Sequence, residues 1–372
     1  MELLRLVQSQ VRLGAPLPWG VRDEAGVLLL ARGHVFIDEA QMQALLRRGA
    51  YVDLEEVKAA ARAEQQVAAR PADLFEQWDK MLWRIDRLLK SIGEAGFAAR
   101  AADVAARLVA LIDRDPDIGI FLSIRKDKPR FTLYGLTHSL HTALLACLMA
   151  RRLGWAAERT LTLVKAALTM NVGILELQGR LAAQGVPAMP PQLDQVGGHP
   201  QQGVAMLQAA GVDDAEWLQA VAEHHERPGG GGYPQGLAQP CEMARALRLA
   251  DIFMARITPR VSRPAISTQD AARDLFKEDG GGPLAMAIIK ELGIYPPGDF
   301  VQLKSGERAV VVRRGDSART PIAASITDKS GMPVVHTTQR DTACEGYAIV
   351  ATLPDSPLVA RMLPERLYGL PA

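Results

Sequence analysis

The stretch "HHERPGGGGYP", residues 224–234, places two adjacent histidines before a glutamate, an arginine and a run of four glycines. Neutral imidazole is a common ligand of iron, zinc and manganese, so a histidine pair at a helix edge indicates a metal site. The glycines are compatible with a loop that approaches a ligand closely or with a mobile connector, because glycine lowers the steric barrier to unusual backbone angles. The stretch therefore predicts a metal site followed by a loop whose role stays open.

The composition is that of an ordinary soluble globular protein. The chain has 372 residues, 48% hydrophobic and 23% charged, which suggests two or three domains. Its net charge of +1 argues against a nucleic acid polymer as partner but leaves room for a small anionic ligand. Cys147, Cys241 and Cys344 are far apart, which favours a reducing compartment. Apolar runs such as 140–150 are shorter than the ~20 residues of a membrane span, so we expect a cytoplasmic protein without signal peptide or membrane insertion.

The periodicity predicts a mainly α protein with small β-containing ends. Residues 1–57 indicate a mixed α/β module, in which a strand, turn and strand precede a helix capped by Asp38. Residues 58–130 are expected to form a helical linker and leading helices, 131–296 a helical domain, and 297–372 a β-containing segment. Helices after the leading one at Trp78–Leu89 are expected at 98–113, 136–153, 156–173, 199–210, 214–225, 242–258, 268–277 and 283–292. The final segment alternates apolar and polar residues around a hairpin turn at Ser305–Gly306, and "MPVVHTT" and "GYAIVAT" indicate further strands.

Five of the seven histidines fall in the helical domain: His138, His141, His199, His224 and His225. Helical bundles build metal sites from side chains on facing helices. Neighbouring helix positions point about 100° apart, so the adjacent pair can share one site only at a helix end or with two adjacent metals. For His141 we expect a structural role, and His34 and His336 lie outside the helical domain and are not expected to bind a metal.

The order of the motifs resembles that of the HD-GYP domain, a subgroup of the HD phosphohydrolase superfamily that hydrolyses cyclic di-GMP. The matching segments, spread over residues 130–320, are "THSLHTALLACLMARRLGW", "AALTMNVGI", "GGHPQQGVAML", "HHERPGGGGYPQGL", "ARALRLADIFMA" and "LGIYPPGDFVQL". The resemblance implies an HD-superfamily helical bundle in a bacterial signalling protein. Each motif alone is weak, but their joint order is hard to reach by chance.

Carried over position by position, the resemblance implies metal ligands at His138, His199, His224, His225 and Asp251. It also implies a ligand-side loop at Arg227, Gly232, Tyr233 and Pro234. The His-Asp pair that names the family falls on Met170 and Asn171, and the lysine that follows falls on Ile174. The aspartate that opens the family's glycine motif falls on Gly229. The catalytic positions are therefore degenerate.

These replacements act on one half of the implied centre. A carboxylate carries charge and two oxygens, so it can bridge two cations, whereas Asn171 is neutral and offers one carbonyl oxygen. Met170 offers a thioether, which is a soft ligand unsuited to a hard divalent ion. Ile174 carries no charge that could support a phosphate group. We therefore disfavour a two-metal centre. Two alternatives are equally supported. The three remaining histidines could hold one divalent ion, iron, manganese or zinc, at reduced occupancy, or the site could hold no ion at all. A buried Asp251 without a metal is expected to pair with His138.

Arginines follow the glycine loop at positions 245, 248, 256, 260 and 263. Guanidinium groups match phosphate oxygens, and cyclic di-GMP has two phosphates. The same arginines could instead form a solvated face, and the sequence does not separate these alternatives.

Three functions are compatible with this sequence. The preferred one is a degenerate HD-GYP-type protein that binds cyclic di-GMP or another signalling protein and has little or no phosphodiesterase activity. The second is an active metal-dependent phosphodiesterase with a reduced metal site. The third is a scaffold similar to HDOD proteins that binds no nucleotide. Whether the chain forms a homo-oligomer stays open.

Overall fold

The structure is a computed structural model of residues 1–372. It describes residues 3–5, 17, 19–34, 36, 38–47, 49–57, 73–125, 131–354 and 362–370. They divide into two compact units, Met1–Asp73 and Leu74–Ala372, which are taken separately below. The first part of the predicted helical linker, residues 58–72, lies outside the described residues.

The first unit is a small mixed α/β module. Its antiparallel sheet has the order β1-β4-β2-β3, made of Leu3–Arg5, Tyr51–Asp53, Val21–Arg22 and Leu28–Leu30. Helix α1, Glu39–Arg47, covers this sheet through an apolar cluster that includes Val21, Phe36, Met42 and Val52. The Asp38 carboxylate accepts the Ala40 backbone N–H at 2.9 Å and caps the helix as predicted.

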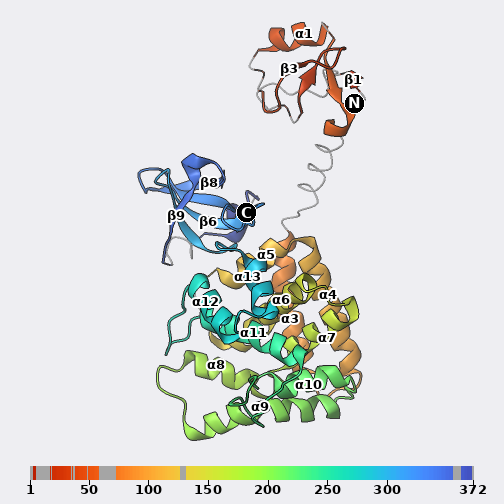
Figure 1. The fold of residues 1–372 in the computed structure, drawn as a ribbon, viewed down its shortest axis with the longest axis vertical. Coiled ribbons are helices and arrows are strands. Elements are labelled where there is room, and N and C mark those ends of the chain that lie inside the picture. Colours follow the sequence, from red (N-terminus) through yellow and green to blue (C-terminus); the bar gives the residue numbers. More distant parts are fainter. Residues whose placement is uncertain are drawn as a thin grey trace. The chain divides into compact units, whose positions relative to one another are not determined.

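The second unit begins with a bundle of helices (Figure 1). They are α3 (Asp73–Lys90), α4 (Phe97–Arg114), α5 (Pro116–Ile124), α6 (Tyr134–Arg152), α7 (Ala157–Thr169), α8 (Leu175–Ala183), α9 (Pro190–Ala209), α10 (Ala215–Glu223), α11 (Glu242–Ile257), α12 (Thr268–Glu278) and α13 (Pro283–Leu292). The predicted mainly α fold class, with a small α/β module before the bundle and a short β segment after it, is confirmed.

Helix α6 lies at the centre of this bundle. It packs against α7, α8, α11 and α13, and it is buried from Tyr134 to Ala150 with few exceptions. Two segments, Phe131–Arg152 and Ala157–Ala183, are long and apolar enough to cross a membrane, but 83% and 72% of their apolar windows are buried inside the fold. Burial of this extent is what the core helices of a bundle require.

Several helix boundaries differ from those predicted. Helix α9 begins at Pro190 rather than at residue 199, because Pro190 and Pro191 occupy its first turn, where a missing N–H costs nothing. The Gln192 side chain also accepts the Met189 N–H at 2.8 Å. Helix α7 ends at Thr169, and a short 3-10 helix, η3 (Val172–Ile174), follows it. Helices α5 and α8 were not predicted.

The chain then forms a five-stranded antiparallel sheet of order β8-β7-β6-β5-β9. Its strands are β5 (Phe300–Leu303), β6 (Arg308–Arg313), β7 (Ile322–Thr327), β8 (Pro333–Asp341) and β9 (Ile349–Thr352). The hairpin between β5 and β6 turns at the predicted Ser305–Gly306. Strand β7 was not predicted, because its alanines and serine carry little β propensity.

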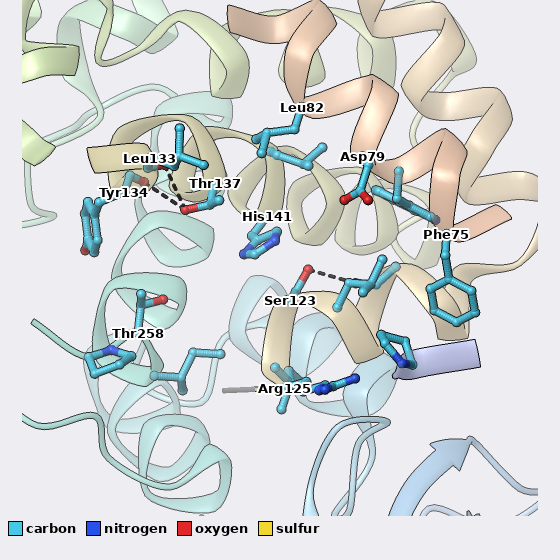
Figure 2. Close-up of a pocket in the computed structure, with 18 of the residues that line it drawn as sticks. Phe75, Asp79, Leu82, Ser123, Arg125, Leu133, Tyr134, Thr137, His141 and Thr258 are labelled. Carbon is cyan, nitrogen blue, oxygen red and sulfur yellow. Dashed lines mark hydrogen bonds between the residues drawn. The ribbon is translucent and has the colours of Figure 1, made fainter. Parts of the chain in front are cut away.

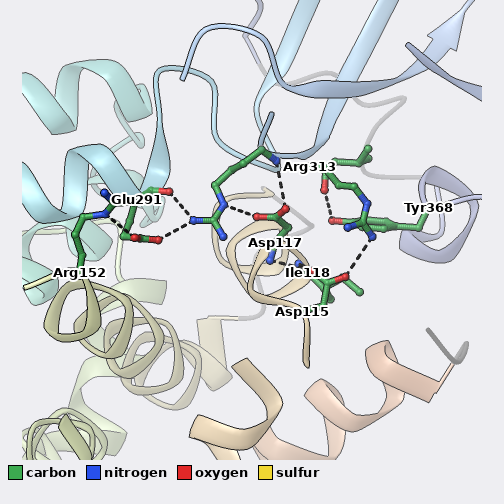
Figure 3. A network of polar contacts seen from close by, with 9 residues as sticks. Asp115, Asp117, Ile118, Arg152, Glu291, Arg313 and Tyr368 are labelled. Carbon is green, nitrogen blue, oxygen red and sulfur yellow. Dashed lines mark hydrogen bonds and ion pairs between the residues drawn. The ribbon is translucent and has the colours of Figure 1, made fainter. Parts of the chain in front are cut away.

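A network of ion pairs joins this sheet to the bundle (Figure 3). Arg314, at the end of β6, donates to Asp117 of α5 at 2.5 Å and to Glu291 of α13 at 2.7 Å. The neighbouring Arg313 pairs with Asp115 at 3.2 Å. Burial raises the pKa of Asp117 despite the opposing charge of Arg314. The sheet is therefore fixed to the bundle by partly buried ion pairs as well as by apolar contacts.

Candidate metal centre

Three histidines converge where α9 meets the end of α10. His199 lies within α9, His224 is the C-cap of α10, and His225 follows it. Their ligating nitrogens all lie within 4.8 Å of one another. Because the chain leaves the helix after His224, the two adjacent imidazoles are not held on separate helix faces. This is the helix-end arrangement that lets both contribute to one site.

Backbone hydrogen bonds fix which ring nitrogens face the site. His199 Nδ1 lies 2.6 Å from the Val196 carbonyl, and His224 Nδ1 lies 2.7 Å from the Val221 carbonyl. A carbonyl only accepts, so Nδ1 carries the proton in both rings and each Nε2 presents a lone pair. These two Nε2 atoms are 3.1 Å apart. Two nitrogens bound tetrahedrally to one ion at 2.0–2.1 Å would be about 3.3 Å apart, so this donor set fits a single divalent ion.

All three imidazoles are held in the neutral form. Burial, reinforced by the charge of His224, lowers the pKa of His199 to about 3. Burial also lowers the pKa of His224 and that of His225. Neutral imidazole is the form that binds a metal, so the site is prepared for an ion at neutral pH.

The other two predicted ligands pair with each other. His138 of α6 and Asp251 of α11 lie 2.6 Å apart from Nε2 to Oδ1. Burial alone would raise the pKa of Asp251, but the hydrogen bond and charge of His138 outweigh it and hold that pKa below its usual value. Among the described residues, Asp251 is not part of the three-histidine cluster. The pairing predicted for an Asp251 without a metal is therefore observed.

The degenerate pair lies between α7 and the 3-10 helix. Met170 is fully buried in the apolar core, and Ile174 is 5% exposed. Asn171 is buried at the start of η3, which packs against α9, the helix that carries His199. The Asn171 side chain makes no hydrogen bond with any residue that the structure describes. The positions that match the family's metal-binding pattern thus retain one carboxylate, that of Asp251.

The glycine loop is held against the histidines by Glu226. This buried carboxylate accepts the backbone N–H groups of Gln235 at 2.7 Å and Leu237 at 2.9 Å. The Tyr233 backbone N–H donates to the His225 carbonyl at 3.3 Å. The loop therefore has defined contacts on both sides of its tip, which favours a built loop over a mobile connector.

The loop also explains why glycine is needed at position 232. A Cβ atom there would lie 2.5 Å from the Arg227 nitrogen and 2.5 Å from the Glu226 Cα. The chain can therefore fold back on itself only because Gly232 lacks a side chain. The next residue, Tyr233, stacks on His225 with ring centroids 4.4 Å apart, and Pro234 follows it. The arginine of the predicted ligand-side loop, Arg227, is exposed.

The arginines that follow the loop separate into two groups. Those of α11 pair with acids of α12 or just after it: Arg245 with Asp279, Arg248 with Glu278, and Arg256 with Asp274 and Glu278. Arg260 instead donates to the Tyr134 hydroxyl at 2.8 Å, and the Tyr134 ring stacks on His138 at 5.7 Å. Arg263 lies beside Arg260, since the two exchange backbone hydrogen bonds. Arg260 and Arg263 therefore adjoin the His138–Asp251 pair through Tyr134, and the charge of Arg248, in addition to its pairing with Glu278, acts on His225 and Tyr233.

Sequence reasoning assigned no role to Glu226 or Tyr134, and it left Arg260 open between phosphate contact and a solvated face. Glu226 is the third letter of the HHE motif, so the motif carried a signal for it. Tyr134 precedes His138 by one helical turn, a spacing that places both side chains on one face. No signal in the sequence pointed to the contact of Arg260 with Tyr134, because it joins residues 126 positions apart.

Part of this chain is similar to known proteins. Residues 124–281 match the family model of the HD domain. Cyclic di-GMP phosphodiesterase PA4108 of Pseudomonas aeruginosa is 27% identical over 249 residues, which cover 65% of this chain. The chain spans 59% of the length of that relative. Among solved structures, Bd1817, an HDG"Y"P protein from Bdellovibrio bacteriovorus, covers 78% of this chain and 99% of its own at 17% identity, with a TM-score of 0.49.

The family match covers the helices that carry all five predicted ligand positions. Residues 124–281 therefore match the HD domain family, and the predicted resemblance to the HD-GYP proteins is confirmed.

Proposed function

We propose that this chain is a degenerate HD-GYP-type protein of cyclic di-GMP signalling in the bacterial cytoplasm, which binds the dinucleotide and hydrolyses it little or not at all. The observation that carries the proposal is the charge of the centre. Among the five described positions that match the family's metal ligands, Asp251 is the one carboxylate, and its Oδ1 is engaged by His138 at 2.6 Å.

Hydrolysis by a two-metal site needs anionic groups that offset the repulsion between neighbouring cations. Asn171 stands where the family has its bridging aspartate, and a neutral amide adds no charge there. Met170 is buried in the core and cannot replace the missing histidine with a hard ligand. We therefore infer that the centre does not hold two ions.

His199, His224 and His225 would hold a single divalent ion, iron, manganese or zinc. When bound, such an ion would supply Lewis acidity and lower the pKa of a water molecule. The histidines orient their Nε2 atoms through backbone carbonyls, as metal-binding histidines commonly do. At most one ion per chain is expected, because these three histidines form a single set of ligands.

Two features next to the centre suit a cyclic dinucleotide. Arg260 and Arg263 adjoin the His138–Asp251 pair through Tyr134, and guanidinium groups match phosphate oxygens. Tyr233 lies against His225 at the other side of the centre and offers a ring on which a guanine can stack. Arg227 is exposed beside the same loop. These groups support binding independently of turnover.

The proposal is tested with the full chain and cyclic di-GMP. Titration calorimetry measures binding, and chromatography measures release of the linear dinucleotide in the presence of manganese or iron. We expect saturable binding that weakens about tenfold or more in Arg260→Ala, without measurable turnover. Arg308→Ala, on an exposed position of β6, is the matched control.

A second candidate is a phosphodiesterase that works with one ion. It is favoured by the three-histidine set, since three protein nitrogens plus water make a workable catalytic site. Metal-dependent turnover that disappears in His224→Ala would establish it in place of our proposal. Failure to bind any nucleotide would instead favour the scaffold reading, in which the chain acts through a signalling protein partner.

A further inference from the structure

A cavity of about 660 Å³ lies between α3, α5, α6 and the segment that begins at Met362. Its volume falls within the range of small-molecule sites. Figure 2 shows His141 of α6 in the middle of this cavity, between Leu82 of α3 and Ser123 of α5. This is the histidine for which the sequence predicted only a structural role.

The cavity is separate from the candidate metal centre. The five predicted metal ligands are all described, and none of them lines the cavity. Tyr134 forms part of the wall and stacks on His138, so this ring stands between the two sites. Thr137 and His141 of α6 line the cavity, whereas His138 pairs with Asp251.

Most of the wall is apolar. It includes Phe75, Trp78, Leu122, Leu133, Leu140 and Ile257. Walls of this kind favour a ligand with an apolar body, because burial of apolar surface is the main favourable term in binding.

His141 is the polar group at the centre of this apolar wall. Its side chain is partly buried and makes no hydrogen bond with any residue that the structure describes. Burial, and then the charge of His138, lowers the pKa of His141 to about 3, so the ring is neutral at pH 7. A neutral imidazole has one N–H donor and one nitrogen lone pair. The ring can therefore donate one hydrogen bond to a ligand and accept another from it.

The hydroxyl groups in the wall add acceptors. The Ser123 hydroxyl donates its proton to the Gly119 carbonyl at 2.8 Å, and the Thr258 hydroxyl donates to the Met254 carbonyl at 2.7 Å. Thr137 likewise donates to the carbonyls of the preceding turn. Each hydroxyl therefore has only lone pairs left for a ligand.

The charged groups in the wall do not favour an ion. They are the Asp79 and Glu365 carboxylates and the Arg125 guanidinium, so an ion of either sign meets a like charge. Arg125 donates to the Met362 carbonyl at 2.5 Å, and Asp79 has an interaction partner of its own. Glu365 Oε2 is buried and presents no surface to a ligand. An ion would therefore lose its hydration in an apolar site that offers it no dedicated opposite charge.

We propose that this cavity binds an uncharged small molecule in which a hydroxyl group is attached to an apolar body. The apolar body lies against the aromatic and aliphatic wall. The ligand hydroxyl accepts the N–H of His141 and donates its own proton to a lone pair of Ser123 or Thr137. Cyclic di-GMP is anionic and falls outside this ligand class, so the inference does not depend on the proposed function.

Three probes of matched shape test the proposal: 2-naphthaleneethanol, 2-naphthaleneethylamine and 2-naphthaleneacetate. At pH 7 the first is neutral, the second is a cation and the third is an anion. Their dissociation constants for the full chain are measured by ligand-observed NMR. We expect the alcohol to bind at least about tenfold more tightly than either ion, because only the alcohol enters without loss of ionic hydration.

Two variants locate the binding. His141→Leu keeps an apolar side chain of similar size and removes both hydrogen bonds of the ring, so it should weaken alcohol binding about fivefold or more. Ser123→Trp should abolish binding of all three probes by filling the cavity. His336→Leu is the matched control, because this exposed histidine of β8 does not line the cavity and its replacement should change nothing. Circular dichroism checks that each variant is folded.

The proposal is overturned if the alcohol does not bind the unmodified chain at millimolar concentration, or if either ion binds as tightly as the alcohol. It is equally overturned if a folded His141→Leu or Ser123→Trp chain binds the alcohol as the unmodified chain does. Should one of these two variants fail to fold, the other decides.

Discussion

The Nε2 atom of His138 lies 2.6 Å from Oδ1 of Asp251, although the two residues are 113 positions apart in the chain. This bond joins the two predicted metal ligands that lie outside the three-histidine cluster. The hydrogen bond and charge of His138 overcome the burial of Asp251 and keep the pKa of its carboxyl group below the usual value. An ionised carboxylate is thus retained, but its first partner is an imidazole.

Replacing His224 by alanine should lower zinc affinity at least about 100-fold, because changes in groups that merely orient a ligand already cost 10- to 100-fold. The His224 Nε2 atom faces that of His199 at 3.1 Å, so its loss removes one of three donors. Competition with a chromophoric chelator measures the affinity. His336→Ala, an exposed histidine outside the helical domain, is the control and should leave affinity unchanged.

Replacing Met170 and Asn171 by the His-Asp pair of the family should return a negative charge to the candidate metal centre. In the double variant Met170→His/Asn171→Asp, we expect the metal content to rise from at most one ion to two ions per chain. Met170 is fully buried, so a histidine introduced there is expected to lower the free energy of unfolding. The single variant Asn171→Asp adds the negative charge without this change in core packing, so it shows the effect of charge alone. A metal content that stays flat in both folded variants would mean that more of the site is lost than these positions.

Gly232→Ala should destabilise the chain by about 1–3 kcal/mol, the range for overpacked sites, because the new Cβ meets backbone atoms at 2.5 Å. Urea denaturation measures the change. Gly197→Ala, in the interior of α9 where nothing lies within 4 Å of the added Cβ, should be neutral or slightly stabilising. Equal effects of the two substitutions would argue against the close approach at Gly232.

The free energy of unfolding should decrease as the pH is lowered, and His141 should account for part of this decrease. Burial, and then the charge of His138, lowers the pKa of His141 to about 3 from an unfolded value of 6.5. The unfolded state therefore binds more protons, and the stability contribution is full above pH 6.5 and is lost as the pH falls from about 6.5 toward 3. Between pH 7 and pH 5 the loss due to this group is about 2 kcal/mol.

Urea denaturation of the unmodified chain and of His141→Phe at both pH values isolates this contribution. The variant should lose about 2 kcal/mol less than the unmodified chain on acidification. The same loss in both proteins would show that His141 is not held neutral by burial.

Much of the fold could be predicted from local pattern. The helices that carry His199, His224 and Asp251 follow the helical period, and the β5–β6 hairpin turns where Ser305–Gly306 predicts it. Helix α5 was missed because its residues are apolar on nearly every side, so no amphipathic period marks it. The start of α9 was missed because two consecutive prolines usually indicate the end of a helix, whereas Pro190 and Pro191 lie in the first turn of α9, where proline is tolerated.

The grouping of the candidate residues could be predicted in part. The resemblance implied five ligand positions, and the replacements at positions 170, 171 and 174 left three histidines together and Asp251 to pair with His138, which is how the structure arranges them. The distances within each group depend on packing across helices, which sequence spacing does not encode. The cavity around His141 likewise depends on residues from α3, α5, α6 and the C-terminal segment, which no single motif brings together.

The most direct test of the account is the number of ions bound per chain. Elemental analysis after reconstitution with manganese, iron or zinc, combined with anomalous scattering from crystals, gives both number and place. The account predicts at most one ion, bound to His199, His224 and His225. Two well-occupied ions a few ångströms apart beside Asn171 would contradict it.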